Sequence, residues 1–329
     1  MVKIITASFF FLSVYIAYGQ PSAQEPLGLA LENYPYPFPV YYFKRNIQQQ
    51  SVAMAYMDVK PSNPNGKTVM LLHGKNFFGA YWEQTIRVLA AQGYRVVIPD
   101  QPGFGKSSKP TVVYSFQMLA EYTHALLDSL KIPTVTVVGH SMGGMLAVRF
   151  TLMYPKQTRQ LVLENPIGLE DYKVYIPYSS IEQEYRKELN KTEAGIRNYH
   201  KAYYAVWKDK YEKYVQVQYR WMLNAEYTRL AWVNALTSHM IYTQPVVYEL
   251  PNIQVPVLLI IGQSDRTVVG KDAVPDSLKN VLGQYPALGK AAAKAIPGAR
   301  LIELKNVGHI PHLEDTEKFN QALKEFIGQ

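Results

Sequence analysis

The sequence predicts an α/β fold with a mostly parallel sheet, and three observations carry that prediction. Short apolar stretches of strand length alternate with amphipathic stretches of helical length across residues 40–166. The alternation stops over residues 167–250, which are helical in composition, and it resumes over residues 251–329. Apolar strands separated by helices are typical of a parallel sheet covered on both faces. We therefore expect one α/β core that is interrupted by a helical insertion.

Length and composition fit this fold and exclude several classes of site. The chain has 329 residues, of which 48% are hydrophobic, enough for a large packed core. It has no cysteine, which excludes disulfides, thiolate-bound metals and a cysteine nucleophile. The net charge is +8, but the basic residues are scattered, so we expect a solvated surface and no nucleic-acid binding.

Residues 1–39 precede the alternating pattern and divide into two segments. Lys3 is followed by an uncharged stretch that ends in Ala17-Tyr18-Gly19, which predicts an export signal over residues 1–19, cut before Gln20. A permanent membrane anchor is the alternative, but the stretch is short for one. The expected location is therefore periplasmic or secreted, with no stable membrane insertion after cleavage. Residues 20–39 carry alternating prolines, which predict an extended segment that lies over the surface through its aromatic side chains.

The first part of the core, residues 40–166, contains six predicted strands. They are residues 40–43, 51–59, 68–72, 94–98, 135–138 and 160–163. Helices are expected over residues 81–92, 116–130 and 142–154, because apolar residues recur there at helical spacing and Gly93 and Pro155 end two of them.

The predicted insertion follows the sixth strand and is rich in aromatic residues. Residues 167–250 hold 13 of the 26 tyrosines and three of the four tryptophans. Most of these side chains should form the insertion's own core. An insertion above the carboxyl ends of the strands would also wall a pocket. The core resumes with strands at residues 256–261 and 299–304 and a closing helix at residues 316–327.

Ser141 stands between a predicted strand and a predicted helix, in the pattern Gly139-His140-Ser141-Met142-Gly143. A serine in such a strand–turn–helix context can hold a strained conformation with its hydroxyl exposed, because the glycines let the neighbouring backbone approach. A serine hydroxyl is a poor nucleophile unless a base takes its proton and an acid orients that base.

The base and the acid are predicted from loops that follow strands. His309, directly after Gly308 in the loop behind the last strand, is the expected base, and His312 is the alternative. Asp265 follows the resumed strand and is the expected acid, with Glu164 at the end of the sixth strand as the alternative. The order Ser141, Asp265, His309 is the one that a nucleophile elbow on an α/β sheet uses.

Two backbone N–H groups are expected to stabilise a developing oxyanion. One belongs to Met142, at a helix start where the dipole favours negative charge. The other belongs to Lys75, after Gly74 in the loop behind residues 68–72, with Asn76 as the alternative. The Lys75 side chain is expected to point to solvent. Attraction of an anionic group of the substrate is the second interpretation.

Together these motifs resemble the α/β-hydrolase superfamily over residues 40–329. The residues that carry the resemblance are His73-Gly74, Asp100 to Ser108, Gly139 to Gly144, Asp265 and Gly308-His309. The resemblance implies an eight-stranded core with a helical lid, no cofactor and no metal, and an acyl-enzyme on Ser141. It assigns His309 as base and then acid, and Asp265 as the residue that sets its tautomer.

Departures from individual relatives narrow the expected reaction. Serine at position 141 argues against epoxide hydrolases and haloalkane dehalogenases, which use aspartate there. The loop Gly74-Lys75-Asn76-Phe77-Phe78 does not resemble that of proline iminopeptidases or of ring-cleavage C–C hydrolases. We therefore expect a hydrolase of small carboxylic esters. An amide or peptide hydrolase and a cofactor-free perhydrolase of haloperoxidase type are the alternatives, and a silent binding protein of the same fold is a non-enzymatic one.

Overall fold

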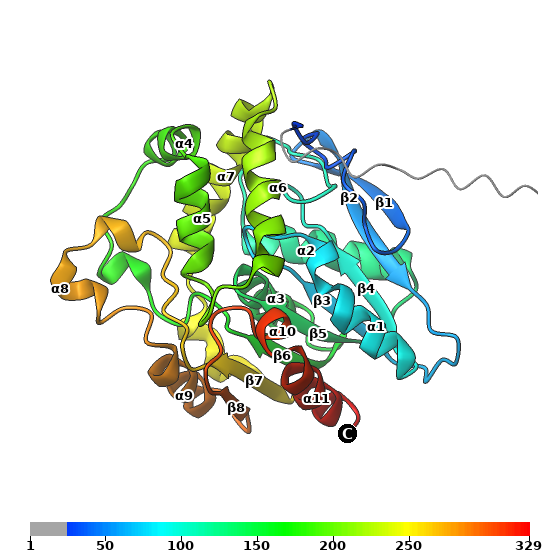
Figure 1. Cartoon of the computed structure of the whole chain (residues 1–329). Coiled ribbons are helices and arrows are strands. Elements are labelled where there is room, and N and C mark those ends of the chain that lie inside the picture. Colours follow the sequence, from blue (N-terminus) through cyan, green and yellow to red (C-terminus); the bar gives the residue numbers. More distant parts are fainter. Residues whose placement is uncertain (1–24) are drawn as a thin grey trace, which may run out of the picture.

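The computed structural model describes residues 25–329 as an eight-stranded sheet with helices around it (Figure 1). The predicted export signal, and residues 20–24 of the predicted extension, lie outside the described residues. Within residues 25–329, no helix has the length and apolar character needed to cross a membrane.

The sheet confirms the predicted fold class. The strands are β1 (Val40–Ile47), β2 (Gln50–Val59), β3 (Thr68–Leu72), β4 (Arg95–Pro99), β5 (Val135–His140), β6 (Thr158–Glu164), β7 (Val257–Gly262) and β8 (Arg300–Leu304). Their order across the sheet is β1-β2-β4-β3-β5-β6-β7-β8. Strand β2 pairs antiparallel with β1 and β4, and all the other pairs are parallel.

The first strand is longer than predicted, because it forms a hairpin with the second. Val40 pairs with Met57 and Ile47 with Gln50, so β1 lies against β2 along its full length. The two connecting residues, Gln48 and Gln49, have φ angles of 46° and 66°. Two positive φ angles are what a two-residue hairpin turn of type I′ requires, and glutamine is not a residue that signals such a turn.

Eleven α-helices surround the sheet within residues 25–329. They are α1 (Glu83–Ala91), α2 (Phe116–Ser129), α3 (Met142–Met153), α4 (Ile181–Leu189), α5 (Glu193–Lys201), α6 (Glu212–Met222), α7 (Tyr227–Thr243), α8 (Asp276–Lys279), α9 (Tyr285–Ala295), α10 (Pro311–Glu314) and α11 (Thr316–Ile327). Helix α9 was not predicted, although its alanine-rich sequence favours a helix.

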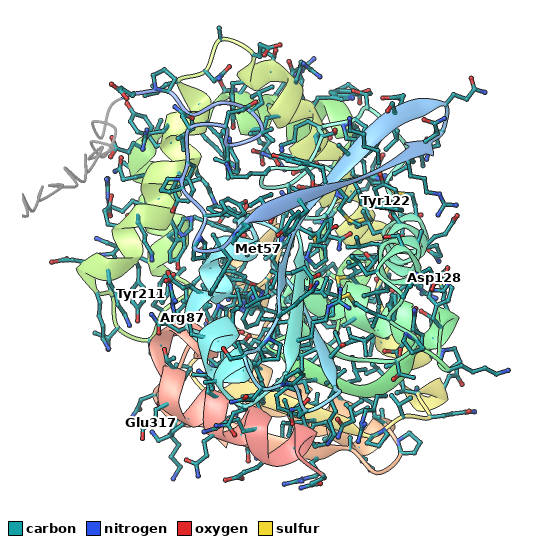
Figure 2. The ribbon with its side chains drawn as sticks, turned by 90° about the vertical axis from the view of Figure 1, so that its right-hand side faces the viewer. Met57, Arg87, Tyr122, Asp128, Tyr211 and Glu317 are labelled. Atoms are coloured by element: carbon teal, nitrogen blue, oxygen red, sulfur yellow. The ribbon has the colours of Figure 1, made fainter. Side chains whose placement is uncertain are left out.

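Alternate side chains of the central strands enter two separate cores. Val69 and Leu71 of β3 pack with α1 and α11 on one face, whereas Met70 and Leu72 pack with α2, α3 and α9 on the other. This division follows from the two-residue period of a strand. Figures 1 and 2 both show α1 beside α11, the pair that closes the first face.

Between β6 and β7 the chain forms four α-helices and no strand, as the composition of residues 167–250 predicts. Helices α4 to α7 stand together beyond the edge of the sheet (Figure 1). Tyr185 of α4 and Trp232 of α7 pack edge to face with ring centroids 5.3 Å apart, so aromatic residues hold these helices together.

Residues 25–39, which precede β1, pack into the protein as well as over its surface. The rings of Tyr34 and Tyr36 pack on Phe78 at 5.3 and 5.6 Å, in agreement with the predicted aromatic contacts. Leu27 and Leu31, however, are fully buried, in a cluster with residues of α6 and α7. The surface expectation is wrong for these leucines, because their packing partners come from the insertion and are distant in sequence. The segment thus ties the insertion to the core.

Candidate active site

Ser141 occupies a strained turn between β5 and α3. Its φ and ψ angles are 56° and −120°, in a region that side chains rarely adopt. A Cβ at Gly139 would overlap the carbonyl oxygen of Gly143, and a Cβ at Gly143 would overlap that of Leu72. The two glycines therefore let β5, α3 and β3 close around the serine, as their positions in the sequence predict.

His309 joins Ser141 to Asp265. Its Nε2 atom lies 2.9 Å from Ser141 Oγ, and its Nδ1 atom lies 2.7 Å from Asp265 Oδ2. A Cβ at Gly308 would overlap the carbonyl oxygen of Tyr203, which accepts a hydrogen bond of 2.6 Å from the N–H of His309. The structure thus brings together the serine, histidine and aspartate that the sequence predicts.

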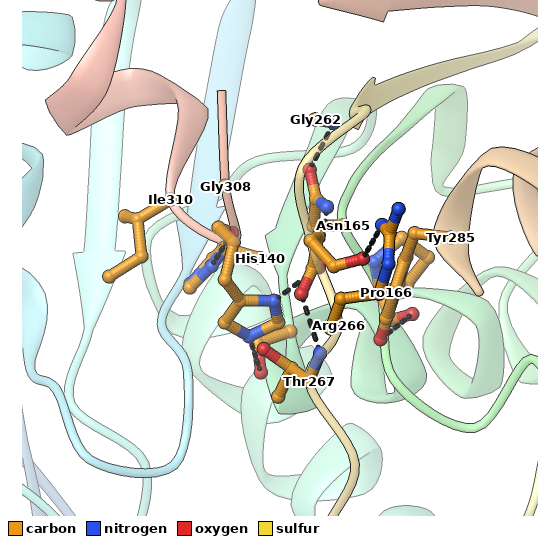
Figure 3. Close-up of polar contacts among 12 residues, drawn as sticks. His140, Asn165, Pro166, Gly262, Arg266, Thr267, Tyr285, Gly308 and Ile310 are labelled. Atoms are coloured by element: carbon orange, nitrogen blue, oxygen red, sulfur yellow. Dashed lines mark hydrogen bonds and ion pairs between the residues drawn. The ribbon is translucent and has the colours of Figure 1, made fainter. Parts of the chain in front are cut away.

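Asn165 is a member of the site that sequence reasoning missed. Its Nδ2 donates to Asp265 Oδ2 at 2.6 Å, and its Oδ1 accepts from the N–H of Gly262 at 2.9 Å (Figure 3). The N–H of Thr267 donates to Asp265 Oδ1 at 2.8 Å. These donors hold the Asp265 carboxylate in place beside His309. Asn165 directly follows β6, which pairs with β7, so its position at a strand end was the available signal.

The site is buried, which corrects the expectation of an exposed serine hydroxyl. Ser141 is 7% exposed, and Asp265 and His309 are each 1% exposed. The ring of Tyr203, which follows α5, stacks on the His309 ring at 5.0 Å and 25°. Nothing in the serine motif predicts this cover, because Tyr203 comes from the insertion. A reaction here would proceed away from bulk water.

The two alternative residues, Glu164 and His312, form a second pair. Both carboxylate oxygens of Glu164 lie 2.9 Å from His312 Nδ1, and Oε1 accepts from the His312 N–H at 2.7 Å. The His312 ring stacks on Trp82 at 3.9 Å. Glu164 therefore faces His312, and Asp265 faces His309.

The loop after β3 lies against the serine. A Cβ at Gly74 would lie 3.2 Å from Ser141 Cβ. The Gly74 N–H donates to Tyr81 Oη at 3.0 Å, and Tyr81 Oη lies 3.0 Å from His140 Nδ1. His140 Nε2 lies 2.9 Å from the His309 carbonyl, which only accepts, so Nε2 carries the proton. Burial holds the pKa of His140 well below its ordinary value, so the ring is neutral.

Three backbone N–H groups closely follow Ser141 or Gly74 in the chain, those of Met142, Lys75 and Asn76. Those of Lys75 and Met142 donate to no protein acceptor among residues 25–329, and neither does that of Asn76. Other groups of Asn76 contact the insertion. Its Nδ2 donates to Tyr203 Oη at 2.8 Å, and its carbonyl accepts from Gln218 Nε2 at 3.2 Å.

The Lys75 side chain does not follow its predicted course into solvent. It lines a pocket together with Glu188 and Lys191, where burial lowers its pKa. The expectation fails because the helices of the insertion cover this loop. Among the described residues, no group of three or more His, Asp or Glu side chains is arranged to hold a metal ion.

Comparison with known proteins agrees with the geometry. Residues 67–316 match the family described as alpha/beta hydrolase fold. The structure of a probable hydrolytic enzyme from Pseudomonas aeruginosa PAO1 superposes with a TM-score of 0.91 and 48% identity, over 93% of this chain and 99% of that one.

Two further relatives carry more specific names. A 2-hydroxy-6-oxononadienedioate/2-hydroxy-6-oxononatrienedioate hydrolase of Paraburkholderia phymatum is 29% identical over 80% of this chain and 88% of that protein. Lipase 3 of Moraxella sp. (strain TA144) is 26% identical over 85% of this chain and 87% of that protein.

Proposed function

This chain belongs to the alpha/beta hydrolase fold family, and on that premise we propose that it is a serine hydrolase that cleaves carboxylic esters. The observation that carries the proposal is the line of contacts from Ser141 Oγ through His309 to Asp265, with distances of 2.9 and 2.7 Å. A serine hydroxyl in contact with a histidine that a carboxylate orients is activated for attack on a carbonyl carbon.

In the first half of the reaction, Ser141 Oγ attacks the ester carbonyl while its proton passes to His309 Nε2. The carbonyl oxygen becomes an oxyanion, which the N–H groups of Lys75 and Met142 stabilise. When the intermediate collapses, His309 returns the proton to the leaving alcohol, and an acyl group remains on Ser141. Asp265 accepts a hydrogen bond from Nδ1 and stabilises the imidazolium.

In the second half, water replaces the alcohol. His309 Nε2 takes a proton from the water, the hydroxide attacks the acyl carbon, and the carboxylic acid leaves as Ser141 recovers its proton. The helical insertion serves as a lid, because Tyr203 covers His309 and excludes bulk water from these steps.

Hydrolysis of a carbon–carbon bond is the second candidate. The relative in Paraburkholderia phymatum is named as a hydrolase of 2-hydroxy-6-oxononadienedioate, a compound with no ester or amide bond, so that its hydrolysis must break a carbon–carbon bond. The sequence of the loop at Lys75 does not resemble that of carbon–carbon hydrolases. The similarity to this relative over 80% of the chain nevertheless makes carbon–carbon hydrolysis a candidate reaction.

Labelling and a substrate panel test the proposal. A fluorophosphonate probe should label the folded protein at Ser141, and p-nitrophenyl esters of short acids should be hydrolysed. Absence of labelling would favour a silent binding protein. Preference for aminoacyl anilides would favour an amide hydrolase, and turnover of a 2-hydroxy-6-oxodienoate without ester hydrolysis would favour the carbon–carbon reaction.

We further propose that the protein is exported to the periplasm or secreted, with residues 1–19 as the signal. The support is the short basic start at Lys3, the uncharged stretch after it and the small residues Ala17 and Gly19. Amino-terminal sequencing of the protein from fractionated cells should begin at Gln20. Recovery of the uncleaved chain in the membrane fraction would identify an anchor instead.

A further inference from the structure

Lys75 reaches two different parts of the molecule. Its backbone follows Gly74 beside Ser141, whereas its side chain lines a pocket between the core and the insertion. The pocket is partly open to solvent and has about 30 Å³ of room for water-sized groups, and we call it the Lys75 pocket. Its polar lining residues are Lys75, Asn76, Glu188, Lys191, Gln218 and Asn234.

The negative charge in the Lys75 pocket is already paired. Lys191 Nζ lies 2.7 Å from each carboxylate oxygen of Glu188, and Asn234 Nδ2 donates to the same carboxylate at 3.2 Å. Burial raises the pKa of Glu188, but the charges of Lys191 and Lys75 together with the hydrogen bonds from Lys191 and Asn234 hold that pKa below its ordinary value. Glu188 is therefore ionised, and its charge is balanced by Lys191.

The ammonium group of Lys75 is left without a partner. Among the described residues, its Nζ makes no hydrogen bond and no ion pair within 4.0 Å. With one carboxylate and two lysines, the pocket carries an excess of one positive charge. Lys75 is half-buried, and a charge that is partly removed from water without a partner is costly, so a ligand that supplied one negative charge would bind favourably.

Lys109 shows how this protein treats a buried lysine that has no ligand to bind. Its Nζ donates to the carbonyl oxygens of Ser107, Gly105 and Phe104 at 2.6, 2.8 and 3.3 Å. The backbone of that loop satisfies the whole ammonium group. Lys75 Nζ makes no such hydrogen bonds within residues 25–329, and it borders a pocket instead of a packed loop.

We propose that the Lys75 pocket binds a carboxylate carried by the substrate, at a distance from the bond that is cleaved. The proposal rests on the proposed ester hydrolysis and narrows its substrates to esters with a free acid group. Because Lys75 stands in the loop beside Ser141, its side chain can hold the acid group while its own N–H faces the reacting carbonyl.

Matched pairs of esters test the proposal. On the acyl side, p-nitrophenyl hydrogen adipate is compared with p-nitrophenyl hexanoate. On the alcohol side, 4-acetoxybenzoate is compared with its methyl ester. The measured quantity is the ratio of kcat/KM for the acidic ester to that for the neutral one, so that changes in overall activity cancel. The pair with the higher ratio shows which part of the substrate enters the pocket.

Two variants should move this ratio in opposite directions. Lys75→Met keeps the backbone N–H and should lower the ratio by about 10-fold to 100-fold, the usual effect of one hydrogen bond to a charged group. Glu188→Gln removes the paired negative charge and should raise the ratio. Lys208→Met, which removes an exposed positive charge from the same insertion, is the control and should leave the ratio unchanged.

The possible failures are distinguishable. If wild type cleaves neutral esters and neither Lys75→Met nor Glu188→Gln changes the ratio, the pocket proposal is wrong and ester hydrolysis stands. If no ester is cleaved, the ester proposal is wrong, and a ligand-binding measurement then tests the pocket proposal. Adipate, but not adipamide, should then raise the Tm of wild type and not that of Lys75→Met. An equal response to both compounds, or to both proteins, would overturn the pocket proposal.

Discussion

His309 lies in the loop before α10 and His312 lies in α10 itself, and each histidine is buried against a carboxylate. The two pairs differ in the group that the other side of the histidine ring contacts. His309 Nδ1 lies 2.7 Å from Asp265, and its Nε2 faces the hydroxyl of Ser141. His312 Nδ1 lies 2.9 Å from Glu164, while its ring lies flat against Trp82 and its Nε2 has no partner among the described residues. A histidine–carboxylate pair is therefore not by itself a catalytic site. The strained serine makes the difference.

The largest expected effect is loss of that serine. Ser141→Ala should lower kcat by about six orders of magnitude, because it removes the hydroxyl that His309 Nε2 contacts. Hydrolysis of p-nitrophenyl esters and fluorophosphonate labelling measure the loss. Circular dichroism should be unchanged, since only one hydroxyl is removed. Activity close to wild type would exclude Ser141 as the nucleophile.

Replacing each of the two carboxylic acids by its amide tests which histidine–carboxylate pair is catalytic. Asp265→Asn should lower kcat by about four orders of magnitude, because the amide stabilises the wrong His309 tautomer. Glu164→Gln is the matched control and should change kcat by less than about tenfold, since Glu164 contacts His312. If Glu164→Gln lowered kcat more than Asp265→Asn does, the pair of Glu164 and His312 would be the catalytic one.

His200 is a buried histidine whose ring is not hydrogen-bonded to a carboxylate among the described residues. Burial lowers its pKa to about 4, and neither ring nitrogen has a partner among the described residues. Between pH 6.5 and pH 4 the unfolded chain binds a proton at this residue that the folded chain does not, so acidification destabilises the fold. The expected loss at His200 is up to about 3 kcal/mol.

His200→Phe isolates this contribution. The pKa values of His73 and His140 are also lowered, chiefly by burial, but both residues are present in wild type and variant. Urea unfolding at pH 7 and pH 4 should show a smaller loss of unfolding free energy in His200→Phe than in wild type. Equal losses would mean that His200 is protonated in the folded protein.

The smallest expected effect concerns the second pair as a structural element. Glu164→Gln should lower the free energy of unfolding by about 1.5–3 kcal/mol, because a buried charged acceptor of two hydrogen bonds is replaced. Glu317→Gln on the exposed side of α11 is the control and should stay within about 0.5 kcal/mol of wild type (Figure 2). A neutral result for Glu164→Gln would leave the pair without a role in stability.

Much of the core could be predicted because its signals are local. The strand-to-helix turn at Ser141 needs small residues at 139 and 143, and these are adjacent in the sequence. The hairpin turn at Gln48 and Gln49 gives no such signal, because antiparallel pairing along the whole of β1 holds it. The cover over His309 could not be foreseen either, since Tyr203 belongs to a helical segment whose periodicity does not show which side chain reaches the core.

By itself the sequence determined the α/β fold and the order of Ser141, Asp265 and His309, because each residue lies in the turn or loop that follows a strand and parallel strands end at one edge. Only the tertiary structure decided that Asp265 faces His309 while Glu164 faces His312, since that pairing depends on which loops meet above β6 and β7. It also decided that the Lys75 side chain enters a pocket. Contacts between distant segments are set by packing, and packing is not encoded in the spacing of residues along the chain.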